Sequence, residues 1–108
     1  MFAQPFSIPA ILIAILSLPL IVGLIPRNHV YGVRTPNTLS TDERWYRANR
    51  FGGCALVLAS AVYLAVAVLV PHAPPPNDSL AVWLLHVAAF LGPLIAGLVA
   101  TRRYARAV

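Results

Sequence analysis

The sequence is poor in charge. It contains no lysine and only three acidic residues, and charged residues make up 10% of its 108 residues, against about 25% in a soluble domain. Hydrophobic residues make up 59%, whereas soluble proteins contain roughly 45–50%. This composition excludes intrinsic disorder, which needs low hydrophobicity and high charge. It also argues against a soluble globule, whose surface would need more charge. The length favours a single domain over residues 1–108.

Cysteine and the common catalytic motifs are equally scarce. The single cysteine, Cys54, cannot form an internal disulfide or build a zinc site from thiolates alone, and we interpret it as a small buried packing residue. The sequence has no glycine-rich phosphate loop, no His-Glu-x-x-His and no Gly-x-Ser-x-Gly. Helix capping explains the adjacent acids Asp42 and Glu43 better than acid–base catalysis does. We therefore predict no catalytic residue, no metal site and no cofactor.

Long apolar runs are what the sequence does contain. Residues 6–25, 51–70 and 80–100 include no Asp, Glu, Lys or Arg. At ~1.5 Å per helical residue, each run reaches about 30 Å, the thickness of the hydrocarbon core of a bilayer. No basic residue precedes the first run, and it is longer than the ~7–15 apolar residues of a signal peptide. We predict an all-α membrane protein with three transmembrane helices and a short cytoplasmic helix in the first loop.

The arginines predict the orientation of these spans. The loop at residues 26–50 contains five arginines and the segment 101–108 contains three, whereas the segment 71–79 carries only Asp78. By the positive-inside rule, the N-terminus lies outside, and the first loop and the C-terminus lie in the cytoplasm. The arginines follow apolar runs, so we predict a multi-pass protein with the lipid bilayer as its partner. We do not expect nucleic-acid binding.

The second half of the first loop predicts a helix. Ser40 is a suitable N-cap, and Glu43 three residues later completes a capping box. Glu43 and Arg47 have the i,i+4 spacing of an ion pair. Trp45 and Asn49 share a helix face, and an aromatic ring such as that of Trp45 suits the headgroup layer. Two glycines between this helix and the second apolar run permit either a bend or a continuous helix.

The arginines of the loop support two interpretations. In the first, Arg34, Arg47 and Arg50 form an anion site with Tyr31 and Asn49 as hydrogen-bond partners, because guanidinium groups match phosphate or carboxylate. In the second, the arginines set the topology and pair with anionic lipid. An Arg34→Ala variant that still inserts in the membrane separates them, because function survives only under the second interpretation.

The spans themselves offer few polar groups. His86 lies inside the third run, and we interpret it as a neutral histidine bonded to a carbonyl or to water. The same run has small residues at a four-residue spacing, which permits close helix packing; they are Ala88, Gly92, Ala96 and Ala100. Three helices enclose little interior, so a homodimer and a membrane-protein partner both remain open.

A series of residues at fixed spacings runs through the first loop. These are Pro26, Asn28, the stretch Tyr-Gly-Val-Arg-Thr-Pro at 31–36, Thr38, Leu39, Ser40, Trp45, Asn49, Arg50, Gly52 and Gly53. The series resembles the SdpI family of bacterial membrane proteins, named for immunity to a secreted toxic peptide. The order of a span, this loop and two further spans is also similar to that family. The resemblance implies a set of functional loop residues, namely Asn28, Tyr31, Gly32, Arg34, Thr35, Pro36, Trp45, Asn49 and Arg50. We add Arg47 to this set, because it belongs to the anion site of the first interpretation.

The resemblance implies a function but no catalytic residue. It implies a bacterial plasma-membrane protein, not an enzyme, that protects against or senses a toxic peptide or envelope stress. Larger family members carry extra spans ahead of this domain, whereas this sequence shows the three-span unit. Two alternatives remain. One is a membrane enzyme or lipid-handling protein that binds an anionic headgroup through the loop, and the other is a helper subunit of another membrane protein.

Overall fold

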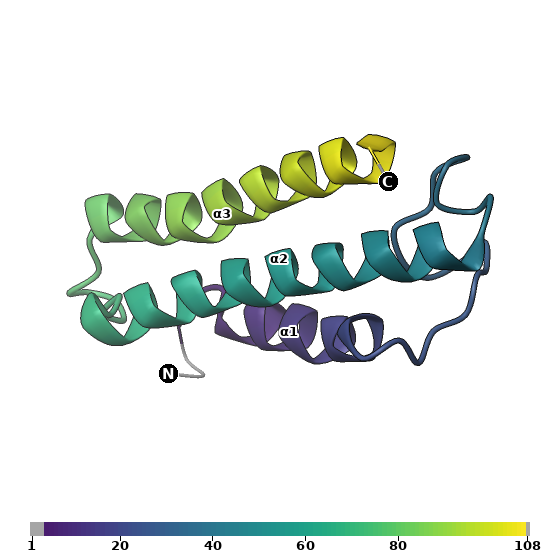
Figure 1. The fold of residues 1–108 in the computed structure, drawn as a ribbon. Coiled ribbons are helices and arrows are strands. Elements are labelled where there is room, and N and C mark those ends of the chain that lie inside the picture. The colour runs from purple at the N-terminus through teal and green to yellow at the C-terminus, as the bar shows by residue number, and fades with distance from the viewer. Residues whose placement is uncertain (1–3, 108) are drawn as a thin grey trace.

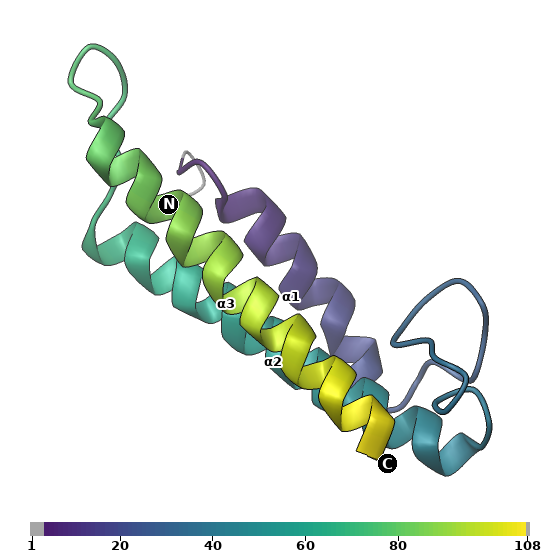
Figure 2. The same cartoon turned by 90° about the horizontal axis from the view of Figure 1, so that it is seen from above.

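The computed structural model describes residues 4–107 and, over that range, contains three helices and no strand. The helices are α1 (Ser7–Ile21), α2 (Asp42–Leu69) and α3 (Leu80–Ala107). Helix α2 lies between α1 and α3 and packs against both (Figure 1). The view from above shows all three running along the long axis of the molecule (Figure 2). The result is an elongated bundle measuring 54 × 22 × 20 Å.

Helices α2 and α3 are long enough and apolar enough to cross a membrane. Each has 28 residues, which corresponds to about 42 Å. The helix predicted in the second half of the first loop is present, and it continues into the second apolar run, because α2 is unbroken from Asp42 to Leu69. The two glycines are contact points rather than a bend. A Cβ on Gly52 would lie 2.8 Å from Val33 Cγ2, and one on Gly53 would lie 2.9 Å from the Ser17 carbonyl oxygen.

The start of α2 differs by one residue from the sequence prediction. The N-cap is Thr41, whose hydroxyl accepts a hydrogen bond from the Arg44 backbone N–H at 3.1 Å. Ser40 instead donates to the Asn37 carbonyl at 2.6 Å, within the preceding turn. The predicted pair between Glu43 and Arg47 is confirmed, with 3.5 Å between Oε1 and Nη2. Both side chains are exposed, so this pair contributes little to stability.

Helix α1 is shorter than the apolar run that contains it. It has 15 residues and ends at Ile21, so it spans about 22 Å, less than the hydrocarbon thickness. Gly23 adopts a φ of 75°, and the Leu24 N–H donates to the Pro19 carbonyl at 3.0 Å. This is the closing bond of a glycine-terminated helix. The predicted span over residues 6–25 is therefore helical only in part.

The segment from Gln4 to Ile25 nevertheless runs the whole length of α2. At one end, the Gln4 amide donates to the His72 carbonyl at 3.4 Å and accepts from the His72 N–H at 2.7 Å. At the other end, Trp45 Nε1 donates to the Ile25 carbonyl at 2.7 Å. We call the end that holds the segment 22–41 and the last turns of α3 the loop end. The end that holds residues 70–79 is the opposite end.

A buried polar chain closes the opposite end. The Tyr63 and His86 side chains are both fully buried. The Tyr63 hydroxyl accepts from the Phe6 N–H at 3.0 Å and lies 2.9 Å from His86 Nδ1. His86 Nε2 lies 2.7 Å from the Val70 carbonyl oxygen and must donate there, because a carbonyl only accepts. The predicted bond from His86 to a carbonyl is confirmed. Within residues 4–107, no group of three residues could hold a metal ion.

The small residues of α3 do not pack as the sequence suggested. Ala88, Gly92, Ala96 and Ala100 are all exposed. The contact with α2 is made instead at Gly97, where an added Cβ would lie 3.5 Å from that of Ala55. The prediction that Cys54 is buried is also wrong, because its side chain is exposed. Cys54 lines an apolar groove of about 520 Å³ between α2 and α3.

Candidate functional site at the loop end

Two side chains from the first turns of α2 hold the loop in place. Trp45 is fully buried, and its indole N–H donates to the Ile25 carbonyl. Asn49 is 1% exposed. Its Oδ1 accepts from the Val33 N–H at 2.5 Å, and its Nδ2 donates to the Val33 carbonyl at 3.4 Å and to the Trp45 carbonyl at 2.9 Å. The predicted shared face of Trp45 and Asn49 is confirmed. The headgroup-layer prediction for Trp45 is wrong, because its ring is enclosed by the loop.

Gly32 is the point where the loop backbone comes closest to these two anchors. Its φ is 116°, a conformation that residues with a side chain rarely adopt. A Cβ at this position would lie 2.5 Å from Asn49 Oδ1 and 3.0 Å from Trp45 Cη2. Only glycine therefore allows the loop to close on α2 here.

The stretch that follows Arg34 forms a turn around a buried threonine. Thr38 is fully buried; its hydroxyl accepts from the Thr35 N–H at 2.8 Å and donates to the Val33 carbonyl at 2.9 Å. Pro36 lies within this turn, which the Leu39 N–H closes by donating to the Thr35 carbonyl at 3.0 Å. The Asn37 amide donates to the Ala105 carbonyl at 2.7 Å and so joins the turn to α3.

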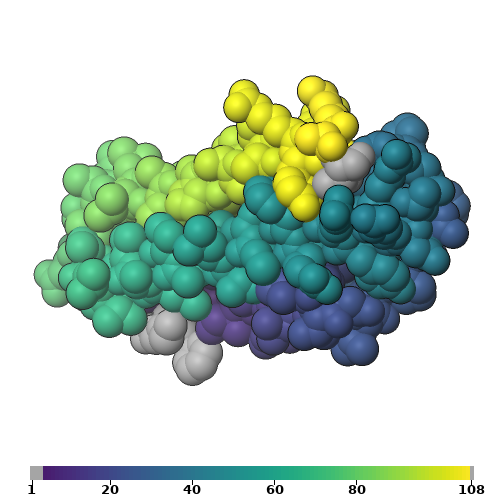
Figure 3. Space-filling model, viewed as in Figure 1, coloured from purple at the N-terminus to yellow at the C-terminus, as the bar shows by residue number. Residues whose placement is uncertain are grey.

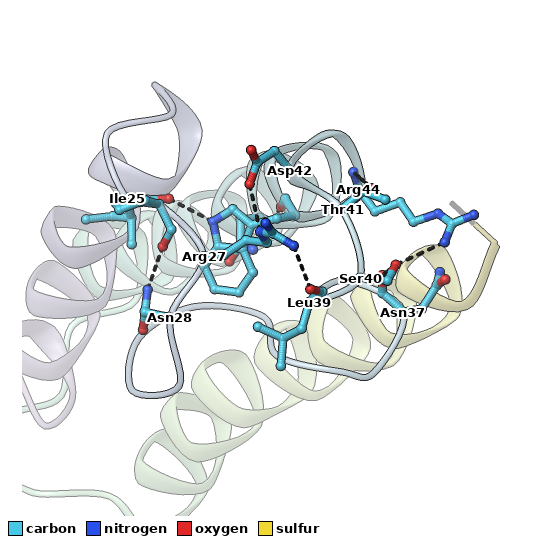
Figure 4. Close-up of polar contacts among 12 residues, drawn as sticks. Ile25, Arg27, Asn28, Asn37, Leu39, Ser40, Thr41, Asp42 and Arg44 are labelled. Atoms are coloured by element: carbon cyan, nitrogen blue, oxygen red, sulfur yellow. Dashed lines mark hydrogen bonds and ion pairs between the residues drawn. The ribbon is translucent and has the colours of Figure 1, made fainter.

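Arg27 and Asn28 hold the first part of the loop. Arg27 Nε lies 2.7 Å from Asp42 Oδ1, and its Nη1 donates to the Leu39 carbonyl at 3.0 Å (Figure 4). Asn28 Oδ1 accepts from the N–H groups of Val30 and Tyr31 at 2.8 and 2.6 Å, as in an Asx turn. Both side chains are thus used to shape the backbone.

The three arginines of the predicted anion site have different partners. Arg34 Nη1 donates to the His29 carbonyl, Arg47 pairs with Glu43, and Arg50 Nε donates to the Ile21 carbonyl at 3.3 Å. The Asn49 amide, which we expected to bind an anion, is instead hydrogen-bonded to the backbone of Val33. Of the three arginines, Arg34 alone lines the pocket described next.

A pocket of about 330 Å³ lies beneath the loop, and we call it the loop-end pocket. Each helix contributes one leucine to its apolar part: Leu20 from α1, Leu56 from α2 and Leu98 from α3. The loop and α3 contribute its polar part, namely Tyr31, Arg34, Thr35, Thr101 and Arg102. Figure 3 shows why α3 takes part, because its last turns (yellow) gather at the same end of the molecule as the loop (blue). The loop-end pocket therefore joins the apolar surfaces of three helices to two guanidinium groups.

Sequence reasoning missed Arg102. The topology placed Arg102, Arg103 and Arg106 at the same end as the loop. Which of the three faces the loop depends on the rotation of α3 about its axis, and this rotation is set by contacts such as Thr101 against Gly52. A second pocket of about 500 Å³ continues from the first and shares Thr35 and Arg102 with it.

Folding of the loop uses most of the candidate residues but not all of them. Asn28, Gly32, Thr35, Pro36, Trp45 and Asn49 shape or anchor the backbone as described above. Tyr31 differs, because its hydroxyl is buried and has no hydrogen-bond partner among residues 4–107. Arg34 differs because it is exposed at the pocket and no acidic group pairs with it in the described chain. Arg50 is likewise exposed and bonded only to a backbone carbonyl, but it does not line the pocket.

Comparison with known proteins supports the assignment of this loop to a defined domain. The model of a family described as the SdpI/YfhL protein family matches residues 24–101. The match covers well over half of the chain and runs from the start of the loop through α2 and most of α3. Among curated proteins and among solved structures, no match to the chain was found.

Proposed function

The chain belongs to the SdpI/YfhL family, and from this premise we propose that it protects a bacterial cell against a toxic peptide or senses envelope stress. One observation carries the proposal: the family match includes a loop that Trp45 and Asn49 fold into a defined structure. A simple connection between two spans would not need buried anchors of this kind. The loop end is therefore where we place the protective activity.

We further propose a topology for the protein in the bacterial plasma membrane. Helices α2 and α3 cross the bilayer, and the segment from Gln4 to Ile25 makes the third passage, with local thinning of the bilayer around the short α1. The loop end lies in the cytoplasm and the N-terminus lies outside. The arginines support this orientation, because they are concentrated at the loop end and basic residues are retained on the cytoplasmic side.

We propose that the protein acts by binding and not by catalysis. The two acids near the loop are already engaged, since Asp42 pairs with Arg27 and Glu43 pairs with Arg47. The third acid, Asp78, lies at the opposite end. Within residues 4–107, this arrangement leaves no side-chain carboxylate at the loop end outside an ion pair to act as a general acid or base.

The test is deletion of the coding sequence from the host bacterium, followed by challenge with a panel of membrane-active peptides. We expect the deletion strain to be more susceptible to at least one peptide and the wild-type chain to restore resistance. Trp45→Ala should fail to restore it, because the loop loses its anchor, whereas Trp83→Ala should succeed, since Trp83 is 41% exposed on α3. Unchanged susceptibility to every peptide, on deletion and on overexpression, would refute the proposal.

A further inference from the structure

We propose that the loop-end pocket binds one molecule of an anionic lipid. The phosphate of the headgroup lies between Arg34 and Arg102, and an acyl chain runs along the leucines of the three helices. This inference goes beyond the proposed function, because it concerns a ligand of the resting protein and does not require that the protein confer resistance.

The charge balance of the pocket favours an anion. Arg34 and Arg102 both line it, and the three acids of the sequence are elsewhere, two in ion pairs with Arg27 and Arg47 and one at the opposite end. Within residues 4–107, the Arg102 side chain has no hydrogen bond or ion pair. Two guanidinium groups at one pocket thus have no acidic partner among residues 4–107, and guanidinium binds phosphate well because its donors match two oxygens at once.

The position of the pocket along α3 favours a lipid over a soluble anion. Leu98 and Arg102 are four residues apart and line the same pocket, so they share one face of the helix. Residues 80–101 carry no charge, and Arg102 is the first charged residue of α3. The pocket therefore extends from the apolar part of the bundle to its first charges, which is the depth at which acyl chains meet headgroups.

The remaining polar surface around the pocket comes from Tyr31 and from a neighbouring pocket. The Tyr31 hydroxyl is buried and without a hydrogen-bond partner among the described residues. Tyr31 lines the same pocket as Arg34 and Arg102. The hydroxyl oxygen itself has almost no accessible surface, so Tyr31 forms part of the pocket wall and does not donate to a bound lipid. The neighbouring pocket shares Thr35 and Arg102 with the loop-end pocket and is also lined by Arg106. The part of the headgroup beyond the phosphate can occupy this second, polar pocket.

The experiment measures lipid binding to the full chain purified in a neutral detergent. Phosphatidylglycerol and phosphatidylcholine are added separately, and bound lipid is counted by native mass spectrometry. We expect selective binding of one phosphatidylglycerol and a loss of affinity of about tenfold in Arg102→Ala, as for removal of one charge-assisted contact. Arg103→Ala removes the same charge from the adjacent exposed position outside the pocket, and it should stay within about twofold of the wild type. Equal losses in the two variants, or equal binding of the two lipids, would overturn the proposal.

Two further arms separate the sources of anion and the role of Tyr31. Inorganic phosphate added in place of lipid should neither raise the melting temperature nor displace phosphatidylglycerol, and full displacement would refute a lipid ligand. Tyr31→Phe should leave the melting temperature of the lipid-free protein unchanged, because the hydroxyl has no partner there, and it should keep phosphatidylglycerol binding within about twofold of the wild type, because the inaccessible hydroxyl does not touch the lipid. Arg34→Ala should weaken that binding, because it removes one of the two guanidinium groups of the pocket. Unchanged binding in Arg34→Ala would refute the contact assigned to Arg34. Peptide susceptibility is read separately, so failure here leaves the proposed function untouched.

Discussion

The Asn49 side chain holds the backbone of Val33 by both of its polar groups. Its Oδ1 accepts the Val33 N–H at 2.5 Å, and its Nδ2 donates to the Val33 carbonyl at 3.4 Å. Asn49 is almost completely buried and lies two turns into α2. The Asn49 amide thus takes the place of the water molecules that would hydrogen-bond to the Val33 backbone in an unfolded loop. The loop is for this reason a folded part of the bundle.

Replacement of Asn49 by alanine should loosen the loop. The Val33 N–H and carbonyl would both lose their buried partner, at a cost of about 1–3 kcal/mol in the free energy of unfolding. Limited trypsin digestion in detergent should cut after Arg34 faster than in the wild type. Asn77→Ala is the control, because Asn77 is exposed in the segment between α2 and α3. Equal digestion rates for the two variants would show that the bonds to Val33 do not hold the loop.

Gly32→Ala should destabilise the protein through one added methyl group. The new Cβ would lie 2.5 Å from Asn49 Oδ1, on a backbone whose φ of 116° disfavours side chains. We expect a loss of about 2 kcal/mol or more in the free energy of unfolding. Gly92→Ala makes the same change on α3, where no atom lies within 4 Å of the added Cβ. That variant should be as stable as the wild type or slightly more stable, and denaturant titration in mixed micelles compares them.

Tyr63→Phe tests the polar chain at the opposite end. It removes the hydroxyl that joins the Phe6 N–H to His86 Nδ1, and we expect a loss of about 1 kcal/mol in the free energy of unfolding. Tyr104→Phe is the matched change in α3. Tyr104 stacks on Phe51 and has no hydrogen bond from its hydroxyl within residues 4–107, so its variant should keep wild-type stability. A Tyr63→Phe protein as stable as Tyr104→Phe would contradict the role of this chain.

Arg47→Ala tests the original three-arginine interpretation of the loop. Arg47 makes an exposed pair with Glu43 and does not line the loop-end pocket. Its removal should change the free energy of unfolding by less than about 0.5 kcal/mol and should leave phosphatidylglycerol binding within about twofold of the wild type. A loss of binding as large as that of Arg102→Ala would show that Arg47 is part of the binding site.

The apolar runs predicted α2 and α3, because membrane-length helices are visible in composition alone. Gly23, which lies shortly before Pro26, also indicates the end of α1. The apolar residues Leu24 and Ile25 follow this glycine, so composition alone extends the predicted span past the end of the helix. Thr41 and Ser40 are neighbouring residues with similar capping ability, so the N-cap was off by one. Trp45 was misassigned because an aromatic residue beside a span suits either the headgroup layer or a buried anchor. The bond to the Ile25 carbonyl that decides between them depends on a reversal of the chain.

The candidate site was predictable in its loop half only. The spacings identified Tyr31 and Arg34, which local sequence places on one segment. Arg102 comes from a helix far along the chain, and its place opposite Arg34 follows from the packing of α3 on α2. Such a pairing depends on three-dimensional contacts between residues distant in sequence.

Cysteine labelling in intact cells tests the membrane topology on which the rest depends. In a Cys54→Ser background, Asp78→Cys and Ala107→Cys place single exposed thiols at the opposite end and at the loop end. A membrane-impermeant maleimide should label Asp78→Cys in intact cells and Ala107→Cys only after the membrane is permeabilised. Equal labelling of both positions in intact cells would contradict a bundle that crosses the bilayer with its arginines in the cytoplasm.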